Sequence, residues 1–241
     1  MVKTGGFSIS LFMMLLTLSV TFGLDASINF YGADKFYYRF FQEPSTGRFQ
    51  YDVNISGDVA SNLNLAFSLW SSHKIILLRG GFSLPEELDY NLSLSYYDPA
   101  FSAGISGNIY TAKAGSYEIG GYFDYYVPTG LDMLSLMLEV SAYSDLKGFY
   151  EELKVVPELI LPLSMVVDIT FPITLGFMEN NFNNYSVNGP TGMSFSPRVS
   201  LIINDSLSCA VSGGYFLGLN NSFSSYPFIM LKIGFKFSSA G

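Results

Sequence analysis

The chain has 241 residues, a length that fits one domain or at most two. Hydrophobic residues make up 49% of it and charged residues only 13%, about half the charged share of an ordinary soluble protein. The formal net charge of −8, without any cluster of basic residues, argues against nucleic acid as a partner. The single cysteine, Cys209, excludes an intramolecular disulfide framework.

The N-terminal segment is typical of an export signal. Lys3 is the only charged residue before an apolar run of roughly 16 residues, which is shorter than the roughly 20 that a membrane-spanning helix needs. Small residues follow the run at Gly23 and Ala26. We therefore expect a signal peptide over residues 1–26, cleaved after Gly23 or Ala26, and one mature domain over residues 27–241.

The mature part of the sequence alternates between apolar and polar residues over long stretches. In residues 49–56 every odd position is apolar and every even position is polar, and residues 88–95 show the converse phase. Successive side chains of a strand point to opposite faces, so this pattern predicts strands with one apolar and one polar face. The predicted strands cover residues 27–41, 48–59, 62–71, 87–97, 100–111, 116–127, 132–143, 149–161, 164–177, 193–203, 206–217 and 226–237.

The connections between these strands alternate in length. Tight turns such as residues 60–61 and 98–99 alternate with usually longer loops such as residues 72–86 and 178–192. Short turns at one end, longer loops at the other and an even strand count are typical of a transmembrane antiparallel up-and-down β-barrel. The sequence thus predicts an all-β barrel of about 12 strands. Residues 27–41 break the alternation, so a barrel of 10 to 11 strands with this segment inside remains an alternative.

The last strand carries a resemblance to a known class. In residues 228–237, alternating hydrophobic residues end in an aromatic, with Ile233, Phe235 and Phe237 at the alternate positions. This segment resembles the C-terminal signal of bacterial outer-membrane β-barrels, which the barrel-assembly machinery recognises. The chain is similar in kind to the porin-like class, and no motif selects one family within it. The resemblance implies the bacterial outer membrane, contact with its lipid, and the assembly machinery as a partner during biogenesis.

If the apolar faces contact lipid, the alternate residues face the lumen. A Lys or Arg on the lipid face costs about 2–4 kcal/mol at mid-depth, so charged residues are expected inside. The charged candidates for the lumen are Asp52, Asp58, Asp89, Glu118, Asp124, Glu139, Lys154, Asp168, Arg198 and Lys232.

Two functions fit this lumen. Acids outnumber cations among the candidates, which predicts a narrow passive channel for small polar or cationic solutes. The alternative is a non-conducting surface barrel, filled inside, whose external loops bind a partner or stabilise the envelope. The volume of the inward side chains distinguishes the channel from the non-conducting barrel. The aromatic residues that would occlude the bore are Tyr97, Tyr110, Tyr122, Tyr126, Tyr143 and Phe216.

Catalysis and cofactor binding have little support in the sequence. His73 is the only histidine, expected in the loop after Trp70, and no Gly-x-Ser-x-Gly motif is present. One histidine and one cysteine do not make a transition-metal site. We therefore expect no enzyme activity, no cofactor and no metal. The long loop over residues 178–192 is interpreted as a solvated connector, with contact to an external ligand or folding into the mouth as a constriction as the alternatives.

Overall fold

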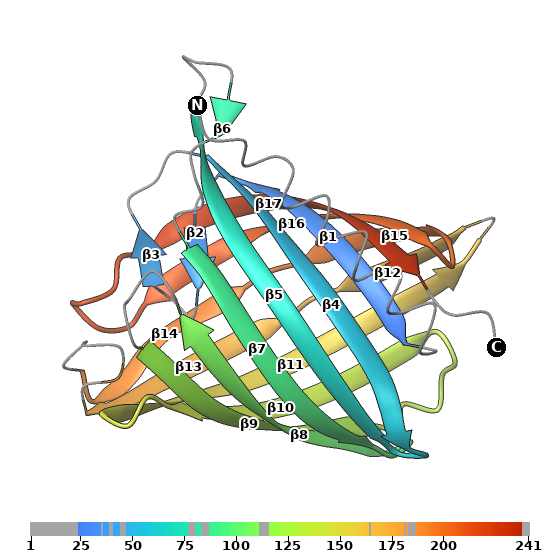
Figure 1. Cartoon of the computed structure of the whole chain (residues 1–241), viewed down its shortest axis with the longest axis horizontal. Coiled ribbons are helices and arrows are strands. Elements are labelled where there is room, and N and C mark those ends of the chain that lie inside the picture. Colours follow the sequence, from blue (N-terminus) through green and yellow to red (C-terminus); the bar gives the residue numbers. More distant parts are fainter. Residues whose placement is uncertain are drawn as a thin grey trace.

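The computed structural model describes residues 24–34, 36–38, 41–43, 47–76, 81–82, 87–110, 116–163, 165–180, 182 and 187–237. It is a closed antiparallel β-barrel of 12 strands, as the sequence predicts (Figure 1). Ten barrel strands are continuous: β1 (Asp25–Ala33), β4 (Arg48–Ala60), β5 (Leu63–Ile76), β7 (Glu87–Tyr97), β8 (Phe101–Tyr110), β9 (Ser116–Val127), β10 (Leu134–Ser144), β11 (Gly148–Pro162), β16 (Leu207–Gly218) and β17 (Tyr226–Phe237).

The other two barrel strands are each divided into two segments. One consists of β12 (Val166–Thr170) and β13 (Ile173–Asn180), and the other of β14 (Gly189–Phe195) and β15 (Arg198–Asn204). Three short strands lie outside the wall or extend it: β2 (Phe36–Tyr38) pairs with β3 (Phe41–Glu43), and β6 (Gly81–Phe82) pairs with the end of β5. No helix in the described ranges has the length and hydropathy to cross a membrane.

The first strand belongs to the wall. β1 pairs with β17 on one side and with β4 on the other, and these two ladders close the barrel. The alternative of 10 to 11 strands with residues 27–41 inside the barrel is therefore wrong. The break in the alternation at Asp34 marks the point where β1 ends and the β2–β3 hairpin follows. The expected signal peptide lies outside the described residues up to Gly23, and β1 begins at Asp25.

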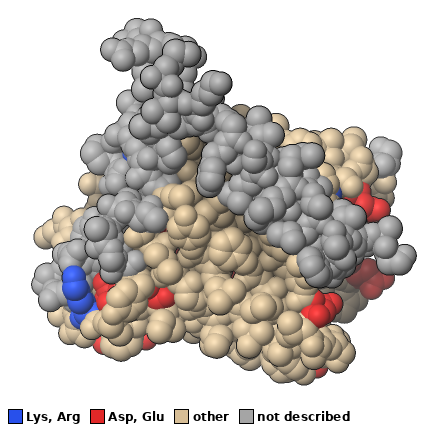
Figure 2. Space-filling model, in the orientation of Figure 1, with Lys and Arg blue, Asp and Glu red and all other residues tan. Residues whose placement is uncertain are grey.

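The pairing register sorts the side chains as the two-residue period predicts. Apolar residues such as Leu92, Ile105 and Ile119 lie on the outer face, with exposed fractions of 55%, 63% and 62%. Ser102 and Ser141, on the inner face, are 1% exposed. In the coloured part of Figure 2, Lys, Arg, Asp and Glu gather toward the margins and the band between them is uncharged. A surface of this kind is suited to hydrocarbon rather than water.

Three prolines interrupt the hydrogen bonding of four neighbouring barrel strands. The amides of Phe171, Ser196 and Gly213 donate to the carbonyls of Pro157, Pro172 and Pro197, at 2.9, 3.0 and 3.2 Å. In an antiparallel ladder such pairs normally exchange two bonds, and proline has no N–H to return the second. We call this line of half-bonded pairs the proline seam. The pairing register is the same on both sides of each interruption, so each divided strand is one strand that lacks hydrogen bonds at its proline.

Short and long connections lie at opposite ends of the barrel. The β4–β5, β7–β8 and β15–β16 turns lie at the end where β1 begins and β17 finishes, which we call the turn end. The connections that carry β2, β3 and β6, and the β13–β14 and β16–β17 loops, lie at the other end, the loop end (Figure 1). In outer-membrane barrels the short turns face the periplasm.

His73 lies within β5, not in a loop as the sequence suggested. β5 continues to Ile76, so His73 still pairs with Phe49 of β4. Its ring lies on the outer face against Tyr51, with centroids 5.7 Å apart. The strand extends because Ile75 and Ile76, which look anomalous in an external loop, continue the ladder with β6.

Candidate functional site

The charged candidates lie on the inner face of the barrel. The register places them on eight barrel strands, on the opposite face from the exposed apolar residues. They are Asp52 and Asp58 on β4, Asp89 on β7, Glu118 and Asp124 on β9, Glu139 on β10, Lys154 on β11, Asp168 on β12, Arg198 on β15 and Lys232 on β17.

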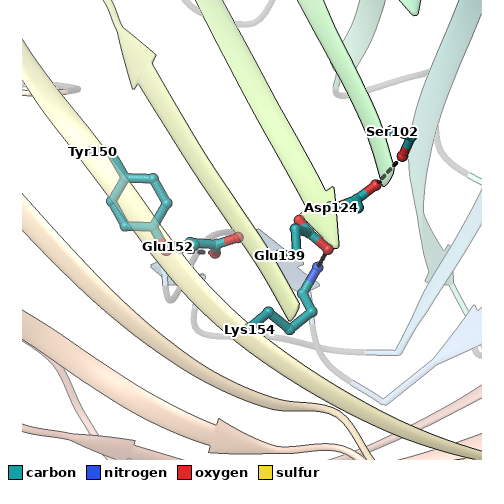
Figure 3. Close-up of polar contacts among 6 residues, drawn as sticks. All are labelled: Ser102, Asp124, Glu139, Tyr150, Glu152 and Lys154. Carbon is teal, nitrogen blue, oxygen red and sulfur yellow. Dashed lines mark hydrogen bonds and ion pairs between the residues drawn. The ribbon is translucent and has the colours of Figure 1, made fainter. Parts of the chain in front are cut away.

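One group of these residues crosses three neighbouring strands. Asp124 is the cross-strand partner of Glu139, and Glu139 is the partner of Lys154. Lys154 Nζ donates to Glu139 Oε2 at 2.6 Å, and Ser102 Oγ donates to Asp124 Oδ2 at 2.7 Å. Figure 3 shows these four side chains in a row across the wall. One cation therefore serves two adjacent acids, so the row carries a net negative charge.

A second acidic group lies on β1 and β4. Asn29 Nδ2 and Tyr31 OH donate to the two oxygens of Asp52 at 2.7 and 2.5 Å, and Asn54 Nδ2 also donates to Asp52. Lys232 lies over the Tyr31 ring, with its Nζ 5.6 Å from the ring centre. These hydrogen bonds hold the Asp52 carboxyl group in place at the wall.

Amide side chains bind two further acids, Glu118 and Asp58. Asn91 Nδ2 donates to Asn108 Oδ1 at 2.6 Å, and Asn108 Nδ2 donates to Glu118 Oε1 at 3.0 Å. Asn64 Nδ2 donates to Asp58 Oδ1 at 2.9 Å. Glu118 is only 2% exposed, whereas Asp58 lies open to solvent at the turn end.

The loop end of the lumen is filled by an apolar cluster that the sequence analysis missed. Its buried members are Tyr150, Met178, Phe182, Val187, Phe216, Phe223 and Tyr226, with Tyr143 and Phe228 packed against them. Phe182 and Val187 come from the connection expected to be solvated, and they are 0% and 4% exposed. The interpretation of residues 178–192 as a plain connector is therefore wrong. These two apolar residues within an Asn-rich loop were the available signal.

The six aromatic residues named as possible obstructions all lie on the inner face. Glycines make room for two of them. A Cβ on Gly104 would lie 2.4 Å from the Tyr122 ring, and one on Gly120 would lie 2.3 Å from the Tyr143 ring. The Tyr122 and Tyr143 rings therefore lie directly against these glycines, in space that a Cβ would occupy.

The two ends of the lumen differ in access. At the loop end, Tyr150 and Phe216 are 0% exposed. At the turn end, the inward side chains of Tyr97 and Tyr126 are 48% and 39% exposed, and the inward Arg198 is also exposed. A pocket of about 160 Å³ opens at this end, lined by Asp25, Ala26, Ser27, Asn54, Ser56 and Lys236. The inward side chains are accordingly exposed at the turn end and buried in the apolar cluster at the loop end.

The residues proposed as an assembly signal lie on the outer face of β17. Ile233 and Phe235 are 48% and 39% exposed, and Phe235 packs edge-on against Phe30 of β1 at 6.3 Å. Phe237 pairs with Ala26 at the start of β1. Within the described ranges, no group of three or more His, Cys, Asp or Glu residues is arranged to hold a metal ion.

Comparison with known proteins identifies the fold and no closer relationship. No family model and no curated protein matches this chain. LpxR from Salmonella typhimurium superposes with a TM-score of 0.60 at 8% identity, covering 88% of this chain and 99% of that one. An outer membrane channel from Pseudomonas putida F1 gives a TM-score of 0.60 at 13% identity, with 89% and 96% covered. The NanC porin gives 0.59 at 8% identity, with 88% and 100% covered.

These similarities concern the fold, because the identities are far below those of recognisable relatives. The fold is that of bacterial outer-membrane β-barrel proteins. The uncharged band of exposed Leu, Ile, Val and Phe side chains gives an independent physical reason for the same location. The bacterial outer membrane is therefore where this chain resides.

Proposed function

We propose that the protein is a narrow passive channel for small polar or cationic solutes, and that the lumen acids set its charge preference. The observation that carries this proposal is the acid-rich inner face, open to solvent at the turn end. Ionised side chains in a barrel surrounded by hydrocarbon need water or partners inside. Asp124 and Glu139 share one lysine, and Asp58 is exposed, so the lining retains negative charge that water must solvate.

Fold similarity supports the proposal at the level of class. The NanC and KdgM structures are described as porins, and the Pseudomonas putida structure as an outer membrane channel. These descriptions belong to those proteins. They show that a barrel of this size and topology is compatible with conduction.

The loop-end cluster favours a second candidate, a non-conducting barrel whose external loops bind a partner. Phe182 and Phe216 are fully buried in the cluster, and the Phe182 and Tyr150 rings stack 5.7 Å apart. A dry apolar plug of this kind blocks ions unless it moves. In the channel proposal the plug is the constriction, and in the second candidate it is a permanent closure.

Planar-bilayer recording of purified protein separates the two candidates. We expect stepwise conductance from the wild-type protein, and larger steps after Phe182→Ala and Val187→Ala, which thin the plug. Conductance that appears only in the plug variants identifies a barrel that is closed in its native form. Silence in the wild-type protein and in the variants, each shown to be folded, contradicts the channel and leaves the second candidate.

Reversal potentials in a salt gradient test the charge preference. Asp124→Asn and Glu139→Gln should each lower the preference for cations, and Glu139→Gln should lower it more because it frees Lys154. Ser106→Ala, at an uncharged inward position of β8, is the matched control. Cation preference that is unchanged in both acid variants would show that other groups set the selectivity.

A further inference from the structure

Four inward side chains on β11, β12 and β15 form a group that is separate from the Asp124–Glu139–Lys154 row. Thr170 on β12 is the direct cross-strand partner of Glu158 on β11 and of Arg198 on β15. Asp168, two residues earlier on the same face of β12, lies opposite Ser200. We call Glu158, Asp168, Thr170 and Arg198 the β12 cluster. It lies in the half of the lumen that opens at the turn end.

The acidic side of the cluster attracts a positive group. Glu158 accepts a hydrogen bond from Ser135 Oγ at 2.5 Å, which fixes one of its oxygens. Glu158 and Arg198 are the charged groups that act on the Asp168 carboxylate. Two neighbouring carboxylates repel each other unless a proton or a cation lies between them. An ammonium group placed here would relieve that repulsion.

Two oxygens of the cluster point to a missing donor. Thr170 is 3% exposed, and within the described part of the chain its Oγ1 has no hydrogen-bond partner. Asp168 Oδ1 is likewise buried without a partner among those residues. Buried polar atoms are normally hydrogen-bonded, so two neighbouring exceptions on one face call for an explanation. An ammonium group carries three N–H donors, enough for Thr170 Oγ1, Asp168 Oδ1 and a Glu158 oxygen.

The other side of the cluster presents a cation. Arg198 is exposed to the lumen, and it makes no ion pair within 4.0 Å with any acid in the described ranges. Its neighbours on the same face, Thr170 and Ser212, are uncharged. A guanidinium group binds a carboxylate through two parallel hydrogen bonds. The cluster thus offers a carboxylate-binding group beside an ammonium-binding one.

We propose that the β12 cluster binds a small zwitterion, with the ammonium group at Glu158, Asp168 and Thr170 and the carboxylate at Arg198. This inference deepens the proposed channel function by naming a substrate class, and in that sense it rests on it. Binding needs access from the turn end, which the exposed Arg198 has, and a shift of the side chains that cover Thr170 Oγ1 and Asp168 Oδ1. A site for a lone cation would not place an unpaired guanidinium beside the two acids.

Calorimetric titration of the folded protein in detergent micelles with three matched probes tests the proposal. The probes are β-alanine, propylammonium and propionate, which share a three-carbon skeleton and differ only in which charged groups they carry. We expect β-alanine to bind at least about tenfold more tightly than either singly charged probe, since each charged contact contributes on that scale. Equal or tighter binding of propylammonium or propionate overturns the zwitterion assignment.

Variants then locate the site. Arg198→Gln, Asp168→Asn and Thr170→Val should each weaken β-alanine binding by about tenfold or more. Arg198→Gln should leave propylammonium binding unchanged or stronger, because it removes a nearby positive charge. Asp124→Asn removes a lumen acid outside the cluster and should leave β-alanine binding unchanged. If Asp124→Asn weakens binding as much as Asp168→Asn does, the site is not the β12 cluster.

Conductance measured on the same preparation separates this inference from the channel proposal. Conductance without β-alanine binding overturns the zwitterion site and leaves the channel. Binding without conductance supports the site and contradicts passage. Thr170→Val keeps the shape of the side chain and removes only the hydroxyl, so it tests the site even if a charge variant fails to fold.

Discussion

Glycines on the inner face of the barrel show how single residues set the shape of the wall. Gly104 and Gly120 accept the Tyr122 and Tyr143 rings, whereas Gly214 accepts neighbouring backbone. A Cβ on Gly214 would lie 2.1 Å from the carbonyl oxygen of Phe195. A side-chain neighbour can rotate away from an added methyl group, and a backbone carbonyl within a ladder cannot.

This difference gives a prediction for two Gly→Ala variants. Gly214→Ala should destabilise the folded barrel by about 1–3 kcal/mol, the usual cost of overpacking. Gly107→Ala is the control, because no atom lies within 4 Å of its Cβ position, and it should be neutral or slightly stabilising. Urea titration of folding into detergent or lipid measures both. Equal stability of the two variants would contradict the close approach at Gly214.

Sequence reasoning was strong on which face a residue occupies and weak on what surrounds it. The two-residue period placed Tyr97 among the inward aromatic residues, and its neighbour Tyr96 therefore on the outer face. In the structure Tyr96 faces outward, while Tyr97 lines the lumen at its turn end. The alternation therefore predicted the face of Tyr97, but not that its side chain would remain 48% exposed. Phe182 is buried in a cluster with side chains from β11, β13, β16 and β17, so no local pattern predicts its burial.

At the scale of the element, the proline seam is the feature that most distinguishes this wall. Phe171, Ser196 and Gly213 each donate one bond across the seam, and their own carbonyls lack the returning donor that a non-proline residue would supply. The sequence showed the prolines but not their alignment. Alignment depends on three registers at once, and each register is set by its own turn.

Restoring one N–H in the seam should have a local effect. In Pro197→Ala the new amide lies opposite the Gly213 carbonyl and completes that pair, so hydrogen exchange of the Gly213 amide should slow. Pro172→Ala should do the same for the Ser196 amide. Pro162→Ala, at the end of β11, is the control and should change neither. Unchanged exchange at both sites, measured by mass spectrometry, would argue that the seam is not a weak line.

The last strand carries the second prediction at this scale. We propose that the outward residues Ile233, Phe235 and Phe237 of β17 are read by the barrel-assembly machinery. Phe237→Ala and Phe235→Ala should lower the amount of folded protein in the outer membrane several-fold while refolding in vitro stays efficient. Ile229→Ala, an outward residue earlier on the same strand, is the control. Gel mobility of unheated samples reports the folded fraction, and equal losses in vitro would assign these residues to stability instead.

At the scale of the whole molecule, the exposed apolar band makes a prediction that a water-soluble protein would not share. Ile105 is 63% exposed at the middle of β8. In lipid, Ile105→Arg should cost about 2–4 kcal/mol, whereas an exposed position in water would tolerate it. Ser106→Asn, on the inner face of the same strand, is the control. A neutral Ile105→Arg in bilayer-based unfolding would contradict lipid contact at this position.

The closed barrel was predictable because the two-residue period, the length of the predicted strands and the alternation of short and long connections all indicated the same fold. His73 was misplaced in a loop, and the N-terminal strand was correctly assigned to the wall but predicted to end too late, because local pattern and ladder pairing disagree there. β1 ends at Ala33 because the chain turns into a hairpin, and β5 runs on because β6 meets it. Whether the protein conducts depends on whether the apolar cluster blocks the lumen. This blockage depends on packing between segments that lie far apart in the sequence.

The inward side chains are exposed at the turn end and buried at the loop end. Because the short turns of outer-membrane barrels face the periplasm, we expect the lumen to be reached from the periplasm. A membrane-impermeant thiol reagent should modify a cysteine placed at Arg198 readily in cells with a permeabilised envelope and slowly in intact ones. Native Cys209, on the lipid face of β16, stays out of reach in both. A solute in the lumen therefore exchanges with the periplasm before it exchanges with the external medium.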